Sequence, residues 1–428
     1  MNFSLSSALK CASAVFAAAI LGCGPDDGLK EFAEGKEAYA LFGTKYGAMD
    51  HTFEVDGKSV TVPDGIAHFL EHKLFENEDG SDTFSRFAAV SASANAFTSN
   101  ELTAFLFSAT DRYHEALEIL LDFVGHPYFT KETVAKEQGI IGQEIRMYDD
   151  DPDYQLYFGL LNCLYREHPV KIDIAGTVES IAEITDTTLY DCYRTFYHPK
   201  NMALVLCGPF DPEKVEEICD RILPAATPFS LSRTAPEEPK EIAQKNITRR
   251  FPVAMGQFAV GLKETELSGS DEALLKRVAA QEVALEICFG RSSDFYDKLY
   301  ESSLISDTFS YSYQFLDSCA FTILQGESED VGAVEDAVRK AVRTAKDTAL
   351  SEEDFRRAQK TVYGGLLLEF NTPSEVASQV LSFHFQGADA LRLPEAVARL
   401  TAEDITERIS HWEEELIASS FILPKEEA

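Results

Sequence analysis

Basic residues are scarce in this sequence. Its 428 residues include 72 Asp and Glu but only 38 Lys and Arg, which leaves 72 − 38 = 34 excess negative charges at pH 7. A surface of this charge repels nucleic acid and anionic lipid, so we expect neither as a partner. The acidic excess fits attraction of basic peptides, but a solvated acidic exterior explains it equally well and is the commoner case.

Paired cysteines are also lacking. None of the eight cysteines forms a CxxC pair, which argues against a zinc knuckle and a thiol redox site. Several lie in apolar surroundings, as in LNCLY and LVLCG. A chain of this length does not need disulfide staples, so we expect buried free thiols and a reducing compartment.

Long apolar runs are absent after the N-terminus, so no membrane span is expected there. The N-terminus itself carries the run CASAVFAAAILGCG, which resembles a secretory signal with a lipoprotein-like site. Only Lys10 supplies positive charge before this run. Together with the free thiols this favours a cytoplasmic protein, and an exported lipoprotein is the alternative.

The length predicts two domains, because a single hydrophobic core rarely supports more than about 250 to 300 residues. Residues 222–245 combine prolines, polar residues and charges without sustained periodicity, which is typical of a linker. We therefore predict a first domain over 1–228, with an atypical segment at 1–35. A linker over 229–246 and a second domain over 247–428 follow.

Both halves show a mixture of helical and strand patterns. Helical spacing appears in 112–124, 131–148 and 211–222, whereas ANAFTSNELTAFLFSAT and NMALVLCG have the character of strands. Near its end each half repeats a helix followed by a strand, in IAEITDTTLYDCYRTFYHPKNMALVLCG and LTAEDITERISHWEEELIASSFIL. This faint repeat favours two similar α+β domains.

The chemistry concentrates in DGIAHFLEHKLFE, where His68, Glu71 and His72 form an HxxEH motif after a candidate cap at Asp64. At about 100° per residue the two histidines lie one turn apart on one helical face. Two such imidazoles can bind one zinc ion, and Glu71 is better placed to take a proton from water than to act as a ligand. An exposed helical face that carries these residues by chance is the alternative.

A third ligand has to come from another segment. KETVAKEQGIIGQEIRMYDDDP contains Glu137 and Glu144, seven residues and so two turns apart on one side of a predicted helix. Glu144 could bind zinc while Glu137 orients the site. From spacing alone a solvated pair of carboxylates is the commoner outcome.

The motifs together resemble the pitrilysin and insulysin metallopeptidases, a family that includes mitochondrial processing peptidase. HFLEH is followed, 144 − 72 = 72 residues after His72, by the second glutamate of ExxxxxxE. SANAFTSNELTAF is similar to the family's substrate-binding edge strand, and FYHPKNMALVLCGPFDP to the end of its first domain. The resemblance assigns His68, His72 and Glu144 as zinc ligands, with Glu71 and Glu137 as catalytic residues.

The same resemblance implies a fold and a mode of action. It implies two similar α+β domains, each a mostly antiparallel sheet packed with helices, which form half of a peptidase clamshell. Peptides or unfolded segments would be cut inside the enclosed chamber. Asn95 would contact the substrate, and the strand around Ala96 would pair with an extended peptide.

Two departures from the family pattern stand out. Active single-chain members carry an Arg and a Tyr seven residues apart in the second half, and alignment of DKLYESSLISDTFSY puts Leu299 and Ser306 there. Arg356 and Tyr363 have the spacing in a helical context instead, and a further group of phenols could substitute: Tyr300, Tyr311 and Tyr313. The expected first strand, before AYALFGTKYG, is replaced by the alanine-rich run.

A missing oxyanion donor can cost a factor of about 10² to 10³ in rate. The resemblance therefore implies a homologous partner subunit that supplies the Arg and Tyr. The predicted function is a zinc-dependent endopeptidase that acts with this partner. A noncatalytic assembly or binding subunit is the alternative, although such a subunit would be free to lose His68, Glu71, His72 and Glu144.

Overall fold

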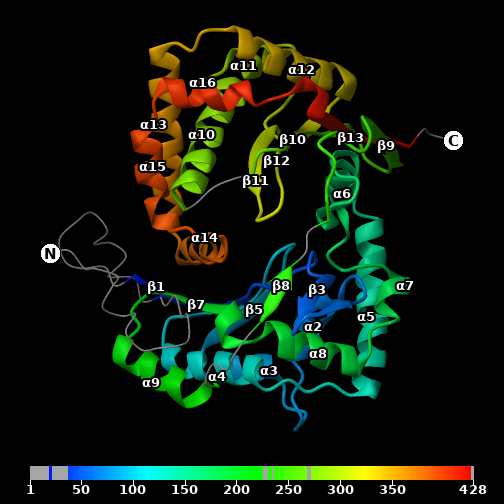
Figure 1. The fold of residues 1–428 in the computed structure, drawn as a ribbon, viewed down its shortest axis with the longest axis vertical. Helices are drawn as coiled ribbons and strands as arrows, with labels where there is room; N and C mark the ends of the chain where they lie inside the picture. Colours follow the sequence, from blue (N-terminus) through cyan, green and yellow to red (C-terminus); the bar gives the residue numbers. More distant parts are fainter. Residues whose placement is uncertain (1–18, 22–36, 225–229, 234–235, 268–270, 426–428) are drawn as a thin grey trace. The chain divides into compact units, whose positions relative to one another are not determined.

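The computed structural model describes residues 19–21, 37–224, 230–233, 236–267 and 271–425. They fold into two compact units, whose elements are labelled in Figure 1. Unit 1 draws on Met1–Ile145, Asp173–Thr234 and Phe370–Phe385, and unit 2 on Arg146–Ile172, Ala235–Glu369 and Gln386–Ala428. Each combines a mostly antiparallel five-stranded sheet with helices, which confirms the predicted α+β class with two similar domains.

Unit 1 contains the larger sheet of strands β1, β2, β5, β6 and β7 and a small sheet of β3, β4 and β8. The strands are Ala19–Leu21 (β1), Ala38–Thr44 (β2), Thr52–Val55 (β3), Lys58–Thr61 (β4), Ala92–Thr98 (β5), Thr103–Ala109 (β6), Met202–Cys207 (β7) and Leu231–Arg233 (β8). The helices are Ile66–Leu74 (α2), Thr83–Ala89 (α3), Tyr113–Gly125 (α4), Lys131–Asp149 (α5), Val178–Ile181 (α7), Asp186–Phe196 (α8), Pro212–Ile222 (α9) and Pro373–Phe385 (α14). Helix α5 continues into unit 2 at its last turn.

Unit 2 is built from one sheet and its covering helices. The strands are Asn246–Phe251 (β9), Gly256–Glu264 (β10), Ser310–Phe315 (β11), Ala320–Ser328 (β12) and Ile417–Pro424 (β13). The helices are Pro152–Leu164 (α6), Asp271–Phe289 (α10), Asp294–Glu301 (α11), Val331–Asp347 (α12), Glu352–Glu369 (α13), Leu393–Arg399 (α15) and Ala402–Ser410 (α16). Short 3₁₀ turns in the two units are Pro169–Lys171, Pro199–Asn201, Ala390–Arg392 and Glu414–Leu416.

The two large sheets have the same pattern of neighbours. Their orders are β1-β7-β2-β6-β5 and β9-β13-β10-β12-β11. In each sheet the first pair is parallel and the remaining pairs are antiparallel. The helix–strand repeat seen in the sequence corresponds to α8 with β7 and to α16 with β13, so the predicted equivalence of the halves is confirmed.

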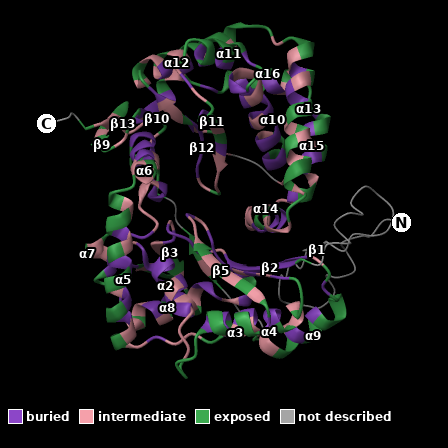
Figure 2. Ribbon diagram, turned by 180° about the vertical axis from the view of Figure 1, so that it is seen from behind, coloured by how far each residue is buried: buried purple, intermediate pink, exposed green. Residues whose placement is uncertain are grey.

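Helices cover both faces of the unit 1 sheet. Phe105 of β6 meets Phe123 of α4 edge to face, whereas a Cβ on Gly43 of β2 would come within 2.6 Å of Leu381 of α14. Gly43 is paired with Ala104, one residue from Phe105, and successive residues of a strand point to opposite faces. Every residue of β2 is therefore buried, while β5 at the edge alternates between half-buried and exposed positions (Figure 2).

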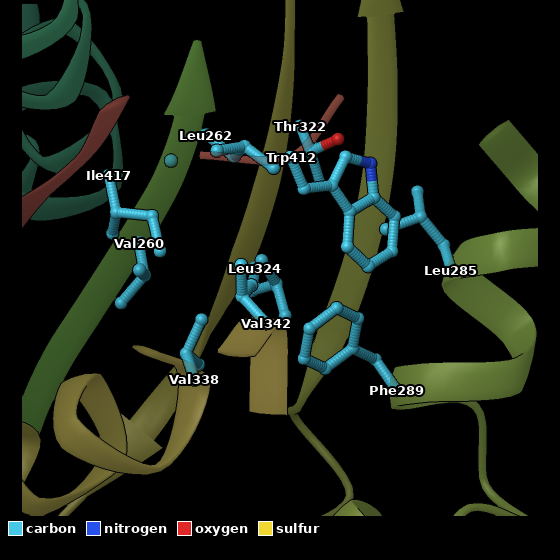
Figure 3. A pocket seen from close by; sticks show the side chains of 11 residues that line it. Val260, Leu262, Leu285, Phe289, Thr322, Leu324, Val338, Val342, Trp412 and Ile417 are labelled. Carbon is cyan, nitrogen blue, oxygen red and sulfur yellow. The ribbon is translucent and has the colours of Figure 1, made fainter. Parts of the chain in front are cut away.

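The core of unit 2 is packed around the single tryptophan (Figure 3). Trp412, Phe289 and Leu285 lie beside side chains of the central strands and enclose a cavity of only about 10 Å³. The indole N–H of Trp412 donates to Oε1 of Gln281 at 3.1 Å. A void of about this size holds at most one water molecule, and an apolar one stays dry. This region is packed core and not a ligand site.

Each half of the chain contributes one helix to the other unit. Helix α6, from the first half, packs on β13, β10 and β9 of unit 2, and α14, from the second half, packs on β7 and β2 of unit 1. A Cβ on Gly261 of β10 would come within 2.9 Å of Leu160 and Leu164, so glycine permits the close approach of α6 there as Gly43 does for α14. The compact units are therefore not consecutive segments of the chain.

Several local predictions can now be compared with the structure. Helices α4, α5 and α9 confirm the helical spacing in 112–124, 131–148 and 211–222. The alanine-rich run itself supplies a three-residue strand, Ala19–Leu21, which pairs with β7 as β1. Within the predicted linker 229–246, Leu231–Arg233 pairs with β3, since alternation over three residues is too short to detect in sequence.

Of the six cysteines in the described segments, four are buried, whereas Cys219 and Cys288 are half-buried. The cysteines of the described segments are free, and Cys11 and Cys23 lie outside those segments. No helix among the described residues is long and apolar enough to cross a membrane.

Candidate metal centre

Helix α2 carries the HxxEH motif, and tertiary contacts fix where it begins. The cap predicted at Asp64 is wrong, because the helix starts after Gly65, whose φ of 86° is left-handed, without a side-chain cap. A Cβ on Gly65 would lie 2.3 Å from the backbone oxygen of Ala175. The hydroxyl of Ser180 donates to the backbone oxygen of Asp64 at 2.9 Å. Ala175 and α7 thus hold the start of α2 in place.

The apolar residues of α2 are more deeply buried than the residues of its motif. Phe69, Leu70 and Leu74 are at most 1% exposed and pack in the core. His68 and Glu71 are also buried, at 9% and 8% exposure. Their polar atoms therefore need partners inside the protein.

Helix α5 supplies these partners from its inward face. Val134, Glu137, Ile141 and Glu144 follow one another at spacings of three, four and three residues, which places them along one side of the helix. The apolar residues of this row are buried, and Glu137 is buried with them. The alternative of a solvated carboxylate pair therefore does not apply to Glu137.

A half-buried amide fixes the position of α5. The side-chain N–H₂ of Gln138 lies 3.1 to 3.3 Å from three backbone oxygens, those of Ile181, Ala182 and Ile184. These residues join α7 to α8, and α7 also contacts the start of α2 through Ser180. The two helices of the site are thus held by the same short segment.

The structure brings His68, His72 and Glu144 together. Nε2 of His68 lies 3.7 Å from Oε1 of Glu144, and Nε2 of His72 lies 3.6 Å from Oε2. One potential ligand atom from each of the three residues lies within 4.8 Å of the others. The side chains of His72 and Glu144 are 27% and 22% exposed, so the cluster is open on one side.

This donor set fits a zinc ion. Ligand atoms about 2.0 to 2.1 Å from a tetrahedral zinc lie about 3.3 Å from one another, close to the separations found here. Nδ1 of His72 lies 3.0 Å from Oε1 of Glu137, which directs its Nε2 towards Glu144. Nδ1 of His68 is buried without a hydrogen-bond partner among the described residues. Two imidazoles and one carboxylate leave a fourth position for water.

The protonation of the cluster suits a metal site. Burial, assisted by the charge of His72, lowers the pKa of His68 to about 4, so its ring is neutral at neutral pH. Burial opposes charge on His72, but the hydrogen bond to Glu137 and the nearby Glu71 and Glu144 outweigh it and raise its pKa. A cation at this position would replace the proton that these carboxylates favour.

Glu71 stands beside the cluster with a partner of its own. The hydroxyl of Thr98, at the end of β5, donates to Oε2 of Glu71 at 2.7 Å. Burial raises the pKa of Glu71, and the hydrogen bond from Thr98 opposes that rise. A carboxylate with a raised pKa next to a metal site is suited to accept a proton from water.

The predicted substrate-binding residues lie on the edge strand. Asn95 and Ala96 are neighbours in β5 and face opposite sides of the sheet, with Asn95 exposed. Oδ1 of Asn95 accepts a hydrogen bond from the backbone N–H of Ala96 at 2.9 Å. In the sheet that the structure describes, β5 is the last strand, so its outer edge is open to another strand.

Unit 2 contains the counterpart of α5 without its carboxylates. The amide of Gln359 in α13 contacts the backbone oxygens of Val397, Ala398 and Leu400, as that of Gln138 does in unit 1. Since 359 − 138 = 221, Glu137 corresponds to 137 + 221 = 358 and Glu144 to 144 + 221 = 365. Those positions hold Ala358 and Gly365. At these two pairs of equivalent positions, the carboxylates lie in unit 1.

The positions that align with the family's Arg and Tyr hold other residues. Leu299 is buried in α11, and Ser306 follows that helix in a loop.

The substitutes considered in the sequence are mostly engaged. Arg356 is paired with Glu352 in α13, and Tyr363 of the same helix is 37% exposed. Hydroxyls of two phenols donate to carboxylates, Tyr311 to Glu286 and Tyr313 to Glu264, whereas Tyr300 is 47% exposed.

Sequence reasoning missed Thr98 and Gln138. Thr98 lies three residues after Asn95 in AFT, a context shared by many strands, so no local signal marks it. Gln138 directly follows Glu137, but a glutamine within a helix is usually exposed.

Two protein-family models match parts of the sequence. The model described as "Insulinase (Peptidase family M16)" matches residues 62–178, which contain the whole metal cluster. The model described as "Peptidase M16 inactive domain" matches residues 183–362.

Similar proteins support this match along most of the chain. The Bacillus subtilis (strain 168) protein described as the uncharacterized zinc protease YmfH is 41% identical over 375 residues, which cover 86% of this chain and 87% of that protein. The crystal structure of an M16-like peptidase from Alicyclobacillus acidocaldarius has a TM-score of 0.87 at 34% identity and covers 91% of this chain and 93% of its own.

A more distant structure shares the fold. The first half of the periplasmic protease PqqL from Escherichia coli has a TM-score of 0.71 at 15% identity and covers 91% of this chain and 88% of its own. A second PqqL structure is not limited to the first half, and the match covers 45% of its chain.

Proposed function

Because this chain belongs to the insulinase family of peptidases, family M16, we propose that it is a zinc-dependent endopeptidase that hydrolyses peptides or unfolded segments. The observation that carries this proposal is the convergence of His68, His72 and Glu144 from two helices, with Glu71 at its side. A chain kept only for assembly would not need a buried carboxylate beside a set of zinc ligands.

In the proposed reaction each residue of the site has a separate task. His68, His72 and Glu144 would hold zinc, which when bound polarises a peptide carbonyl and lowers the pKa of water. Glu71 accepts the proton of the attacking water and delivers it to the leaving amine. Glu137 holds the ring of His72 in the orientation that ligation needs.

We also propose that the substrate binds as an added strand along β5. The outer edge of β5 is open, and backbone hydrogen bonds to an extended peptide are independent of the peptide's sequence. Asn95 would contact this peptide beside Ala96. This mode requires an unfolded segment, which is why folded proteins are not proposed as substrates.

A homologous partner subunit is part of the proposal. The chain covers 88% of the first half of PqqL but only 45% of the longer PqqL chain. Leu299 and Ser306 stand where an Arg and a Tyr are expected. A partner that contributes this pair and closes a clamshell around the substrate would complete the site.

The alternative is a noncatalytic assembly or binding subunit. The description "inactive domain" for the match over 183–362 and the replacement of the Arg and Tyr favour it. For location we propose the cytoplasm over export, since the free thiols suit a reducing compartment.

The decisive experiment measures zinc content and peptide cleavage on the same preparations. The native chain, purified with any bound partner, is assayed with a quenched fluorescent peptide of unfolded sequence. We expect about one zinc per chain, bound also by Glu71→Gln, and a rate in Glu71→Gln lower by at least about 10². Glu132→Gln, an exposed change on α5, serves as the control. Zinc binding without cleavage, alone or with the partner, would favour the assembly subunit.

A further inference from the structure

The carboxylate of Glu71 is linked by hydrogen bonds to two successive threonine hydroxyl groups. Oγ1 of Thr98 lies 2.7 Å from Oε2 of Glu71 and 3.3 Å from Oγ1 of Thr103. Thr103, on the neighbouring strand β6, is fully buried. Its hydroxyl donates to the backbone oxygen of Tyr46 at 2.9 Å.

The number of hydroxyl protons decides which group donates in each of these hydrogen bonds. Each threonine hydroxyl has one proton to donate. The proton of Thr103 goes to the oxygen of Tyr46, so Thr103 can only accept from Thr98. The proton of Thr98 is closer to Glu71, at 2.7 against 3.3 Å, and a charged acceptor binds it more strongly. Thr98 therefore donates to Oε2 whenever Glu71 is ionised.

We propose that Thr98 is a positioning residue that makes Oε1 the proton-accepting oxygen of Glu71. The inference rests on the proposed peptidase function and deepens it. The hydroxyl of Thr98 takes up one of the two lone pairs of Oε2 and makes this oxygen the weaker base, so Oε1 is left as the better acceptor of the proton from water. The carboxylate is also held in one rotamer, so no orientational entropy is lost when the reaction begins.

The hydrogen bond also joins two parts of the site. Thr98 is the last residue of β5, and its side chain lies on the same side of the strand as that of Ala96. If β5 shifts when a peptide adds to its edge, the hydroxyl that donates to the carboxylate of Glu71 would therefore move with it.

Three variants of the zinc-loaded chain with its partner test the inference. Thr98→Val keeps the shape and removes the hydroxyl, Thr98→Ser keeps the hydroxyl, and Thr61→Val makes the valine change on the exposed strand β4. Loss of a hydrogen bond to a charged group predicts a kcat about 10 to 100 times lower for Thr98→Val. KM should stay within about twofold, because Thr98 orients the base and is not proposed to bind the substrate. Thr98→Ser should restore kcat to within about threefold of wild type.

A structural readout is independent of activity. Crystal structures of the metal-free wild type and of both Thr98 variants should show the carboxylate of Glu71 at the same place in wild type and Thr98→Ser, and rotated in Thr98→Val. An unrotated carboxylate in Thr98→Val, or an unchanged kcat, overturns the inference. If the wild type cleaves no peptide, the proposed function fails, and the crystal structures alone decide whether Thr98 positions Glu71.

Discussion

Removal of the carboxylate of Glu137 should weaken zinc binding although Glu137 is not placed as a ligand. Its Oε1 lies 3.0 Å from Nδ1 of His72, and the residue is only 8% exposed. This hydrogen bond fixes the proton on Nδ1, so the lone pair of Nε2 faces Glu144. In Glu137→Leu the ring loses its acceptor and can rotate or change tautomer.

The magnitude follows from the kind of hydrogen bond that the substitution removes. Loss of an acceptor that orients a metal-binding histidine typically costs 10- to 100-fold in metal affinity, which corresponds to about 1.4 to 2.7 kcal/mol. Glu137→Gln keeps an oxygen that can accept from Nδ1 but without charge. Neutral hydrogen bonds are roughly half as strong as charged ones, so we expect a loss of about three- to tenfold for Glu137→Gln.

Equilibrium competition against a fluorescent zinc chelator at neutral pH measures these affinities. Glu132→Gln, an exposed change on the same helix, should bind zinc as the wild type does. Thermal unfolding of the metal-free variants separates a loss of fold from a loss of ligation. If Glu137→Leu folds normally and binds zinc within about twofold of wild type, the orienting role derived from this hydrogen bond is refuted.

Two further predictions concern stability. Gly65→Ala should lower the free energy of unfolding, measured by thermal unfolding, by more than about 2 kcal/mol, because φ is 86° and the new Cβ would lie 2.3 Å from a backbone oxygen. The control Gly80→Ala, at φ 72° with open space around it, should lower the free energy of unfolding by less. Partial burial would raise the pKa of Glu238, but hydrogen bonds from Lys263 and from the backbone of 166–168 outweigh it and lower the pKa to about 2. The resulting stabilisation should be present above pH 4.5 and lost as the pH falls towards 2. Denaturant unfolding of Glu238→Gln should therefore depend less on pH in this range than that of the wild type, and equal slopes would contradict the prediction.

The sequence predicts those parts of the fold that produce a pattern in consecutive residues. The helical spacing of 112–124, 131–148 and 211–222 and the helix–strand repeat at the end of each half were sufficient for two similar α+β domains. The exchange of α6 and α14 between the units leaves no such trace. An apolar helical face has the same pattern whichever sheet it covers.

The start of α2 shows the limit of local rules. Asp64 is a good capping residue in isolation, yet the helix begins after Gly65, where the backbone is pressed against Ala175. A contact between residues more than a hundred positions apart outweighed a preference of about 1 kcal/mol. The short strand Ala19–Leu21 was missed for a related reason, since pairing with β7 compensates for its weak local pattern.

For the site, the sequence by itself determined which groups lie on α2, because the HxxEH spacing and the period of a helix place two imidazoles one turn apart. Only the tertiary structure decided that Glu144 faces them, that Glu137 is buried against His72 and that Thr98 reaches Glu71. These residues are separated by 27 to 76 positions in the chain, and no periodic pattern encodes a contact at such a distance. The contacts arise because the apolar rows of α2 and α5 are buried and α2 packs against β5, so that the polar atoms of these elements are left to one another.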